Sequence, residues 1–273
     1  MSKINFMNKD NSRLYIIFNI LGVVLAITFN FLAVSLPINN KTTGELSDAF
    51  PNYFVPAGFT FSIWGIIYVL MIGFALFQLW KFQKKSAETT EIVNAISHWF
   101  FASCVANATW IIFWHYEKVA LSLATMFFLL YSLIRLYQAV SSFRPMNFSN
   151  AVGIHLFISV YLGWISVATI ANVTTMIIST GWQSNASVQG TWTIVMIIIA
   201  AILGIIMIFR KQDIPYALVI VWALWGIYSK RISFPEDVVS LQVATVAKYS
   251  MVMLSIYAIL NLVGRRSYFF EHK

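Results

Sequence analysis

Three apolar segments of the chain each carry a pair of residues at helical spacing, and these pairs are the residues best suited to chemistry. In chain order the pairs are Trp64 with Tyr68, Asn107 with Trp110, and Trp164 with Ala168. Residues three or four positions apart share one face of an α-helix. Three such faces would enclose a pocket with flat aromatic walls and one amide, which suits a flat apolar ligand.

Aromatic residues make up 16% of the chain, with ten Trp, and they also have a simpler explanation. Trp and Tyr form belts at the membrane–water interface, and Phe fills helix contacts. This explains the tryptophans at the ends of predicted segments, namely Trp80, Trp99, Trp182 and Trp192. It explains Trp64, Trp110 and Trp164 less well, because each lies inside an apolar segment beside polar or small neighbours.

Other kinds of site find little support in the sequence. No His or Cys spacing suits a metal, no Ser/His/Asp set suggests nucleophilic catalysis, and no glycine-rich loop suits a phosphate. Cys104 is the single cysteine, and we expect it to be a small packing residue. The sequence therefore indicates no catalytic residue, no metal and no resident cofactor, and leaves open whether the protein has an enzymatic activity.

The ten acidic residues all lie in predicted tails, loops or the extreme ends of apolar segments. Ion-coupled carriers usually keep a carboxylate inside the helix bundle, because the coupling ion needs a ligand there. We therefore expect no carboxylate in the interior. This counts against a driven transporter, though not against a passive one.

Long apolar runs must position the candidate residues. Of the 273 residues, 59% are apolar and 10% are charged, against roughly 25% charged in an average soluble domain. A helix of about 20 apolar residues crosses the hydrocarbon layer, and no alternating strand pattern is present. The predicted spans are 14–36, 56–80, 94–114, 118–140, 151–179, 191–209, 213–229 and 243–263.

These spans predict an all-α, multi-pass membrane protein. The first span is longer than the roughly 7–15 residues of a signal-peptide core, so we expect it to be retained. The weakest span is 213–229, because it is short and carries Pro215 near its start. It could be tilted, kinked or re-entrant.

Lys and Arg are distributed unevenly over the joints between spans. One side has Lys3, Lys9, Arg13, Lys81, Lys84, Lys85, Arg135, Arg144, Arg210, Lys211, Arg265, Arg266 and Lys273. The other side has only Lys41, Lys118, Lys230, Arg231 and Lys248. Cytoplasmic loops are enriched in basic residues, so both termini are predicted in the cytoplasm and the loop 37–55 outside. The net charge of +8 then reflects topology and lipid headgroups, not nucleic acid.

The residues of the second, third and fifth spans resemble those of the TspO/MBR family, the bacterial tryptophan-rich sensory proteins and the mitochondrial translocator protein. The segment Pro56–Met71 resembles the second-helix pattern Pro-Pro-x-x-x-x-x-x-Trp-x-x-x-Tyr-x-x-Met, without the second Pro. Asn107–Trp114 resembles the third-helix pattern Asn-x-x-Trp/Phe-x-x-x-Phe, with Trp in place of the last Phe. Tyr161–Asn172 resembles the fifth-helix pattern Tyr-Leu-x-Trp-x-x-Phe-Ala-x-x-x-Asn. The motifs occur in the family's order.

This resemblance implies a TspO-like five-helix membrane bundle over residues 14–180. Residues 181–273 would form a C-terminal extension with about three transmembrane helices and no counterpart in the short family members. It also implies a sensor or regulator that binds tetrapyrroles, such as protoporphyrin or haem precursors, and a light-dependent porphyrin breakdown has been proposed for bacterial members. The short members dimerise, so a homodimer is among the expected partners, together with membrane lipid.

The expected ligand-binding residues are Trp64, Tyr68, Asn107, Trp110, Trp164, Ala168, Phe54 and Phe61. Phe54 stands where many family loops have Trp, and the stretch after Asn172 lacks the family's proposed cholesterol-recognition residues. We expect an integral protein of a bacterial cell membrane. The alternative function is a transporter or permease of a small apolar or amphipathic solute, in which the extension completes a pathway.

Overall fold

The computed structural model describes residues 11–35, 38–143, 151–182 and 185–263, and all regular elements within these ranges are helical. The long helices are α1 (Ser12–Ser35), α3 (Ile63–Gln83), α5 (Trp99–His115), α6 (Val119–Ser141), α8 (Phe157–Ser179), α9 (Ala186–Ile206), α10 (Ile214–Arg231) and α11 (Val238–Val263). Shorter helices are η1 (Ile38–Asn40), α2 (Thr43–Asp48), η2 (Gly58–Ser62), α4 (Ala87–Ile96), η3 (Ala151–Leu156) and η4 (Met207–Lys211).

Six of these helical segments are long and apolar enough to cross a membrane, and the bent pair α4 and α5 would add a seventh. The protein is therefore an all-α, integral, multi-pass membrane protein, as predicted. The weakest predicted span, 213–229, is the single continuous helix α10, in which Pro215 occupies the first turn and so replaces no helical hydrogen bond. Its 18 residues extend about 27 Å at 1.5 Å per residue, but α10 is not among the six segments above, so its crossing of the membrane stays a prediction.

The predicted span 94–114 is wrong at its start. The helix breaks after Ile96, and α4 and α5 meet there at 48°. Ser97 takes φ 52 and ψ −132, a conformation outside the helical region, so the chain cannot continue as one helix through this point. The helix after the break starts at Trp99 and has 17 residues, so this region is long and apolar enough to cross the membrane only if α4 and α5 are taken together.

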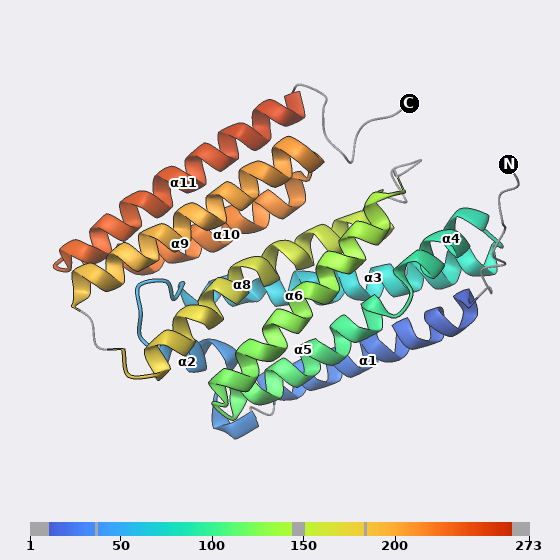
Figure 1. Ribbon diagram of the computed structural model, residues 1–273, viewed down its shortest axis with the longest axis horizontal. Coiled ribbons are helices and arrows are strands. Elements are labelled where there is room, and N and C mark those ends of the chain that lie inside the picture. The colour runs from blue at the N-terminus through green and yellow to red at the C-terminus, as the bar shows by residue number, and fades with distance from the viewer. Residues whose placement is uncertain (1–10, 36–37, 144–150, 183–184, 264–273) are drawn as a thin grey trace, which may run out of the picture.

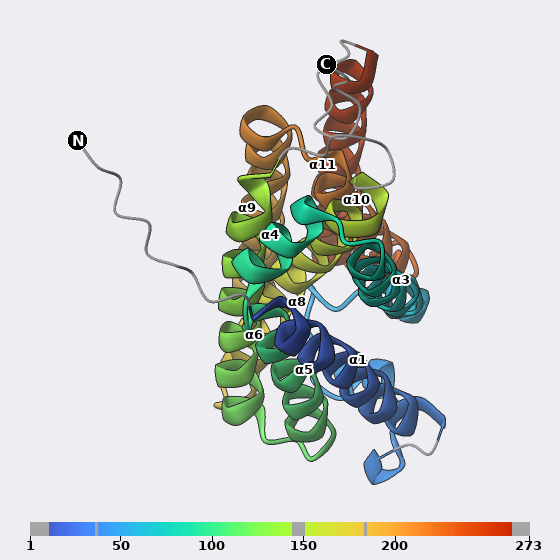
Figure 2. The ribbon, with the colours of Figure 1, turned by 90° about the vertical axis from the view of Figure 1, so that its right-hand side faces the viewer.

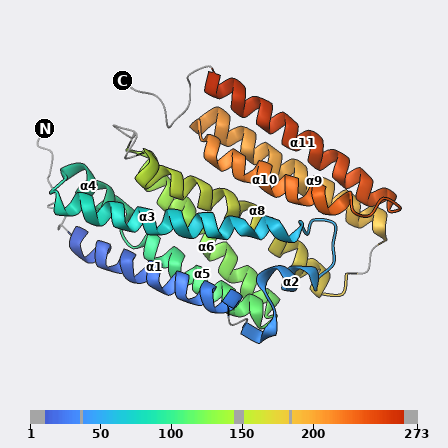
Figure 3. The ribbon, with the colours of Figure 1, turned by 180° about the vertical axis from the view of Figure 1, so that it is seen from behind.

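Successive long helices alternate in direction, so the molecule has two ends (Figure 1). We name the end formed by residues 38–62, 115–119 and 231–238 the lid end, and the end formed by residues 81–98, 141–143 and 207–213 the basic end. Seen from behind, α1 begins and α11 finishes at the basic end (Figure 3). The joints that carry most of the described Lys and Arg residues therefore lie together at the basic end, as the orientation predicted from these residues requires. Lys3, Lys9, Arg144, Arg265, Arg266 and Lys273 lie outside the described residues.

Helix α8 lies at the centre of the molecule, with α3 and α6 on opposite sides of it (Figure 2). In the most apolar stretch of the span containing α8, 72% of residues are buried, against 28–39% in the other five spans. Helices α9, α10 and α11 form a layer on one side, and α10 packs directly on α8 (Figure 1). The main cluster of buried apolar side chains runs from Val23 in α1 to Leu254 in α11. The division at residue 180 stays a prediction.

Hydrogen bonds between amide side chains join α1 to its neighbours. Asn19 Nδ2 donates to Gln78 Oε1 of α3 at 2.8 Å, and Asn30 Nδ2 donates to Asn107 Oδ1 of α5 at 2.5 Å. Cys104 is fully buried, with its Sγ against the backbone position of Gly22, as expected of a packing residue. Because apolar surfaces alone give helices little reason to associate in lipid, close approach and polar contacts such as these define the neighbours.

The expectation that no carboxylate lies in the interior is wrong for Asp213. This residue does lie at a helix end, but its exposed fraction is 0%. Its oxygens accept hydrogen bonds from the Tyr216 backbone N–H at 3.1 Å and from Ser159 Oγ of α8 at 2.7 Å. The carboxylate thus caps the N-terminus of α10 while it is covered by α8, a tertiary contact that local sequence does not reveal.

We predict that a cysteine introduced at Ser47 is labelled by a membrane-impermeant thiol reagent from outside the cell, and that one at Ser86 is labelled only after the membrane is opened. Ser47 lies in α2 at the lid end and Ser86 precedes α4 at the basic end. The unsubstituted protein is the control, because Cys104 is fully buried and should not react. The reverse pattern would overturn the orientation derived from the basic residues.

Candidate functional site

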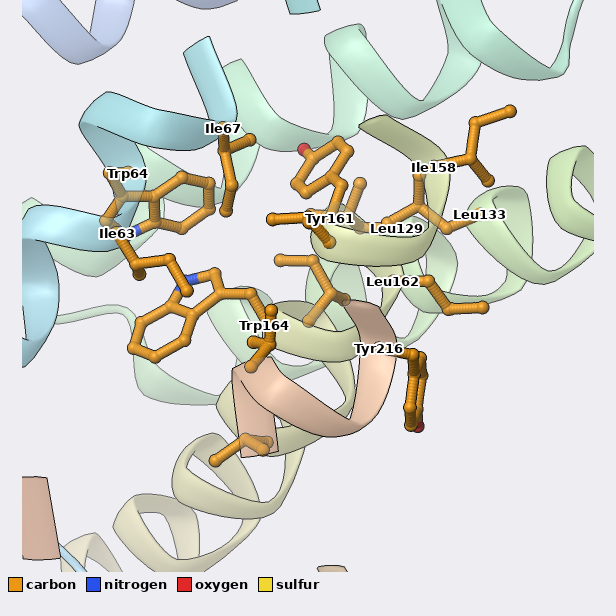
Figure 4. Packing of buried hydrophobic residues seen from close by; sticks show 14 of the residues in the cluster. Ile63, Trp64, Ile67, Leu129, Leu133, Ile158, Tyr161, Leu162, Trp164 and Tyr216 are labelled. Carbon is orange, nitrogen blue, oxygen red and sulfur yellow. The ribbon is translucent and has the colours of Figure 1, made fainter. Parts of the chain in front are cut away.

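Aromatic rings from three helices are stacked against one another near the lid end. The ring of Trp64 in α3 lies between Tyr68 and Trp110, with centroid separations of 5.6 and 5.8 Å and near-parallel planes. Trp110 in turn stacks on Trp114 at 6.0 Å. Trp164 of α8 meets Trp64 edge-on, with ring centroids 6.1 Å apart and an angle of 83° between the planes, and Figure 4 shows the two side chains next to each other. Stacked and edge-on pairs are both favourable arrangements of aromatic quadrupoles.

A small cavity of about 50 Å³ lies beside these rings. Six of the eight predicted binding residues line it: Phe54, Phe61, Trp64, Trp110, Trp164 and Ala168. Its other lining residues are Thr43, Ser47, Asn52, Val55, Pro56, Trp114, Val167, Ala171, Asn172, Thr175, Ala223 and Ile227. The structure therefore brings most of the predicted set together around one space, with walls that are mainly apolar.

The other two predicted residues lie outside the cavity lining. Tyr68 is one turn beyond Trp64 toward the basic end, and it supports the Trp64 ring from behind. Asn107 is one turn below Trp110 in the same direction, and its side-chain oxygen is held by Asn30 of α1. Both residues share the predicted helix face, but the cavity occupies only the part of that face nearest the lid end.

Asn172 is the buried amide that does line the cavity. Its Oδ1 accepts hydrogen bonds from Trp110 Nε1 at 3.2 Å and from Ser122 Oγ at 3.1 Å, and its Nδ2 donates to the Ala168 carbonyl at 2.9 Å. These bonds fix the plane of the Trp110 ring between α5, α6 and α8. The indole Nε1 of Trp164 is also buried, but it has no acceptor among the described residues. It is a donor that a bound molecule could use.

The loop between α1 and α3 covers the cavity, and we call residues 38–62 the lid. Its short helix α2 begins with a capping box, in which the Thr42 side chain accepts from Glu45 N and the Glu45 carboxylate accepts from Thr42 N. The bond from the Thr42 backbone lowers the pKa of Glu45. The cap is therefore complete above the usual Glu range and is lost only as the pH falls through the lowered pKa.

Two ion pairs join the lid to different helices. Lys41 pairs with Glu117, after α5, at 2.7 Å, and Asp48 pairs with Lys230 near the end of α10. Below them, Phe54 points inward from the lid and is only 2% exposed. The lid is thus anchored at its surface by exposed charges and closed underneath by an aromatic side chain.

Helix α10 supplies both a wall of the cavity and anchoring points for the lid. Ala223 and Ile227 line the cavity. The Gly226 carbonyl accepts a hydrogen bond from Ala57 N at 2.9 Å. A Cβ atom at Gly226 would overlap the side chain of buried Thr60, so glycine is what lets the lid pack this closely on α10. Trp222 Nε1 also donates to the Thr60 carbonyl at 2.9 Å.

Sequence reasoning missed the residues of α8 that follow Ala168 on the same face, and those of α10. Ala171, Asn172 and Thr175 are seven, eight and eleven positions after Trp164, so continued helical spacing could have indicated them. No comparable signal points to Ala223 or Ile227, because their place at the cavity depends on how α10 packs against α8.

The cavity is too small for a large ligand as it stands. A volume of about 50 Å³ accommodates only a few water molecules, whereas drug-sized ligands occupy pockets of roughly 300–1,000 Å³. Any flat ligand of that size must displace Phe54 and Val55 of the lid or turn the indole rings. A ligand of that size therefore binds only if the lid or the indole rings move.

The chain matches a known protein family. A family model described as TSPO-like protein matches residues 16–260. The matched range runs from α1 through most of α11, so it includes α9 and α10 as well as the helices that carry the aromatic motifs. No curated protein and no solved structure matches the chain.

Replacing Asn172 with Ala should destabilise the folded protein by about 1–3 kcal/mol, because it leaves the buried donors of Trp110 and Ser122 without an acceptor. Thermal unfolding in detergent measures the loss. The matched control is Thr125→Ala in α6, whose hydroxyl only bonds within its own helix on an exposed face and whose loss should cost less than about 0.5 kcal/mol. Equal effects of the two substitutions would show that the Asn172 network contributes nothing specific.

Proposed function

We propose that this chain, which belongs to the TspO-like family of membrane proteins, is a sensor that binds a flat apolar ligand of the tetrapyrrole type between the stacked tryptophans. The observation that carries the proposal is the group of indoles from α3, α5 and α8 around one cavity. Planar rings stack favourably on such surfaces, at about 0.5–1.5 kcal/mol for each pair beyond the gain from burial. The free Nε1–H of Trp164 offers one directional contact to the ring nitrogens of a tetrapyrrole.

The lid makes a sensor plausible on physical grounds. A ligand that fills the cavity must move the lid, and the lid is bonded to α10 through Gly226, Trp222 and Lys230. Ligand binding would therefore favour a state in which these bonds are altered, and α10 would pass that change to α9 and α11, against which it packs. We place the lid end outside the cell and the basic end in the cytoplasm, so the ligand would arrive from the outer side.

The alternative derived from the sequence is a transporter or permease. Buried Asp213 is the observation that bears on it, since a coupled carrier needs an interior carboxylate. Both oxygens of Asp213 are already engaged, one by the Tyr216 backbone and the other by Ser159. This carboxylate therefore supports the junction of α8 and α10, and it does not favour a carrier over a sensor.

Protoporphyrin IX should bind the purified protein saturably in lipid nanodiscs, and Trp64→Ala should weaken the binding about tenfold or more. The substitution removes a stacking surface and its buried area, and about 1.4 kcal/mol corresponds to a factor of ten. Trp164→Phe, which keeps a ring but removes the indole N–H, should weaken it less. The change in porphyrin absorbance on titration with protein gives the dissociation constants.

Trp80→Ala is the control for these titrations. Trp80 lies on the same helix as Trp64, but near the basic end, and it is 49% exposed. It should leave the affinity unchanged. Absence of saturable binding to the wild-type protein would sink the tetrapyrrole assignment, and equal losses in the Trp80 and Trp64 variants would place the binding elsewhere.

Trp222→Phe should speed the association of protoporphyrin about fivefold. It removes the hydrogen bond to the Thr60 carbonyl, which is worth about 1 kcal/mol, and so makes opening of the lid easier. Stopped-flow absorbance measures the rate. The control is Trp225→Phe, whose ring contacts the same Phe59 side chain at 5.0 Å but is 45% exposed. If both variants associate at the wild-type rate, the lid does not limit access to the cavity.

A further inference from the structure

A second hollow lies at the lid end, between the lid and the turn from α10 to α11. Its volume is about 440 Å³. The charged and amide or hydroxyl side chains that give it its polar character are those of Asp48, Asn52, Gln189, Lys230, Arg231, Asp237 and Ser240. Asn52 and Val55 line both this hollow and the aromatic cavity. Only residues of the lid therefore separate a mainly apolar space from a polar one.

Arg231 is the residue of this hollow that lacks a partner for one of its donors. It is the last residue of α10 and is only 7% exposed. Its guanidinium lies over the rings of Tyr53 and Phe234, with centroid distances of 5.6 and 5.4 Å. Its Nε is buried and has no hydrogen-bond partner. A buried donor of a charged group without an acceptor is costly, so an acceptor supplied by a ligand would be bound favourably.

The carboxylates around the hollow are engaged by other groups. Asp48 pairs with Lys230. Asp237 accepts hydrogen bonds at the start of α11, from Ser240 Oγ at 2.9 Å and from Val239 N at 3.0 Å. Both acidic side chains thus have local roles, in tying down the lid and in capping a helix. Both also act on the Arg231 charge through space, but neither accepts a hydrogen bond from its Nε, and Arg231 itself lines the hollow.

We propose that this second hollow binds the carboxylate of an amphipathic ligand whose flat ring system occupies the aromatic cavity, with Arg231 as the anchor. The inference rests on the proposed function and narrows its ligand class to flat apolar rings that carry an acidic side chain. Guanidinium is the side chain best matched to a carboxylate, because its planar N–H groups donate to both oxygens at once. The ligand would lie across the position of Asn52 and Val55, so it would bind only with the lid displaced.

The arrangement also gives the C-terminal helices a direct part in recognition. Arg231 and Lys230 end α10, and Asp237 and Ser240 begin α11. A carboxylate bound at Arg231 would contact these helices while the ring contacts α3, α5 and α8. The N-terminal helices would then bind the ring system of the ligand, and the C-terminal helices would bind its carboxylate.

The test compares protoporphyrin IX with its dimethyl ester, which has the same ring system but no carboxylate. Both are titrated against wild type and Arg231→Gln in nanodiscs of phosphatidylcholine. Wild type is expected to bind the acid at least tenfold more tightly than the ester. Arg231→Gln is expected to lose this preference, with its affinity for the ester within twofold of wild type.

Two further variants sharpen the comparison. Lys118→Gln removes an exposed cation at the same end of the molecule but outside both hollows, and it should leave the preference unchanged. Arg231→Lys keeps the charge and most of the stem but lacks the Nε–H, and it should reduce the preference at least threefold. If Arg231→Gln does not yield folded protein, Arg231→Lys is used in its place to test the proposal.

The outcomes separate the two proposals. Saturable binding of acid and ester with equal affinity by wild type would overturn the role of Arg231 and leave the aromatic site standing. A loss of affinity for both ligands in Arg231→Gln would show that Arg231 is only structural. A preference that disappears when phosphatidylglycerol replaces phosphatidylcholine would assign Arg231 to a lipid phosphate and overturn the carboxylate. If neither porphyrin binds wild type, the proposed function itself fails.

Discussion

Gly163 lets the backbones of α8 and α10 come together, and the position of α10 depends on this contact. A Cβ atom at Gly163 would lie 2.9 Å from the Tyr216 carbonyl oxygen, so a larger residue would push α10 outward. One turn before Gly163, Ser159 bonds to Asp213 at the start of α10. With α10 held in this place, its far end reaches the lid, and Gly226 accepts the hydrogen bond that closes it. The wall that α10 gives to the cavity and the bonds by which it holds the lid thus both depend on the close contact between α8 and α10 at Gly163.

The molecule divides into a helical interior and a lid that is bonded to it at α5 and α10. Between the helices, buried amides such as Asn107 and Asn172 make hydrogen bonds that would be costly to break in lipid. The lid, by contrast, is held at its surface by exposed ion pairs, which contribute little because water screens them. Local opening takes place where the stabilising contacts are weakest. Among the contacts of the lid, these ion pairs are therefore the ones that break most easily.

Helix α10, one of the three C-terminal helices, contributes to the site in three ways. Ala223 and Ile227 form part of the cavity wall, Trp222 binds the lid, and Arg231 lines the adjoining polar hollow. The match to the TspO-like family also continues to residue 260, beyond the first five long helices, three of which carry the aromatic motifs. A five-helix bundle without this layer would leave the same tryptophans with a different boundary and a freer lid. The extension therefore bears on which ligand is bound and how it gains access.

The sequence by itself determined that the chain is a helical membrane protein, which family it resembles, and which faces of three helices carry the aromatic residues. Those features depend on local composition and on the 3.6-residue period of a helix, and both can be read along the chain. Only the tertiary structure decided that Tyr68 and Asn107 lie behind the cavity, that Asp213 is buried, and that α10 completes the site. These features depend on how deep along each helix the cavity lies and on which helices touch. In lipid, small residues and a few polar contacts between distant parts of the chain determine which helices touch. Such residues do not recur at a regular spacing, so they are hard to recognise in the sequence.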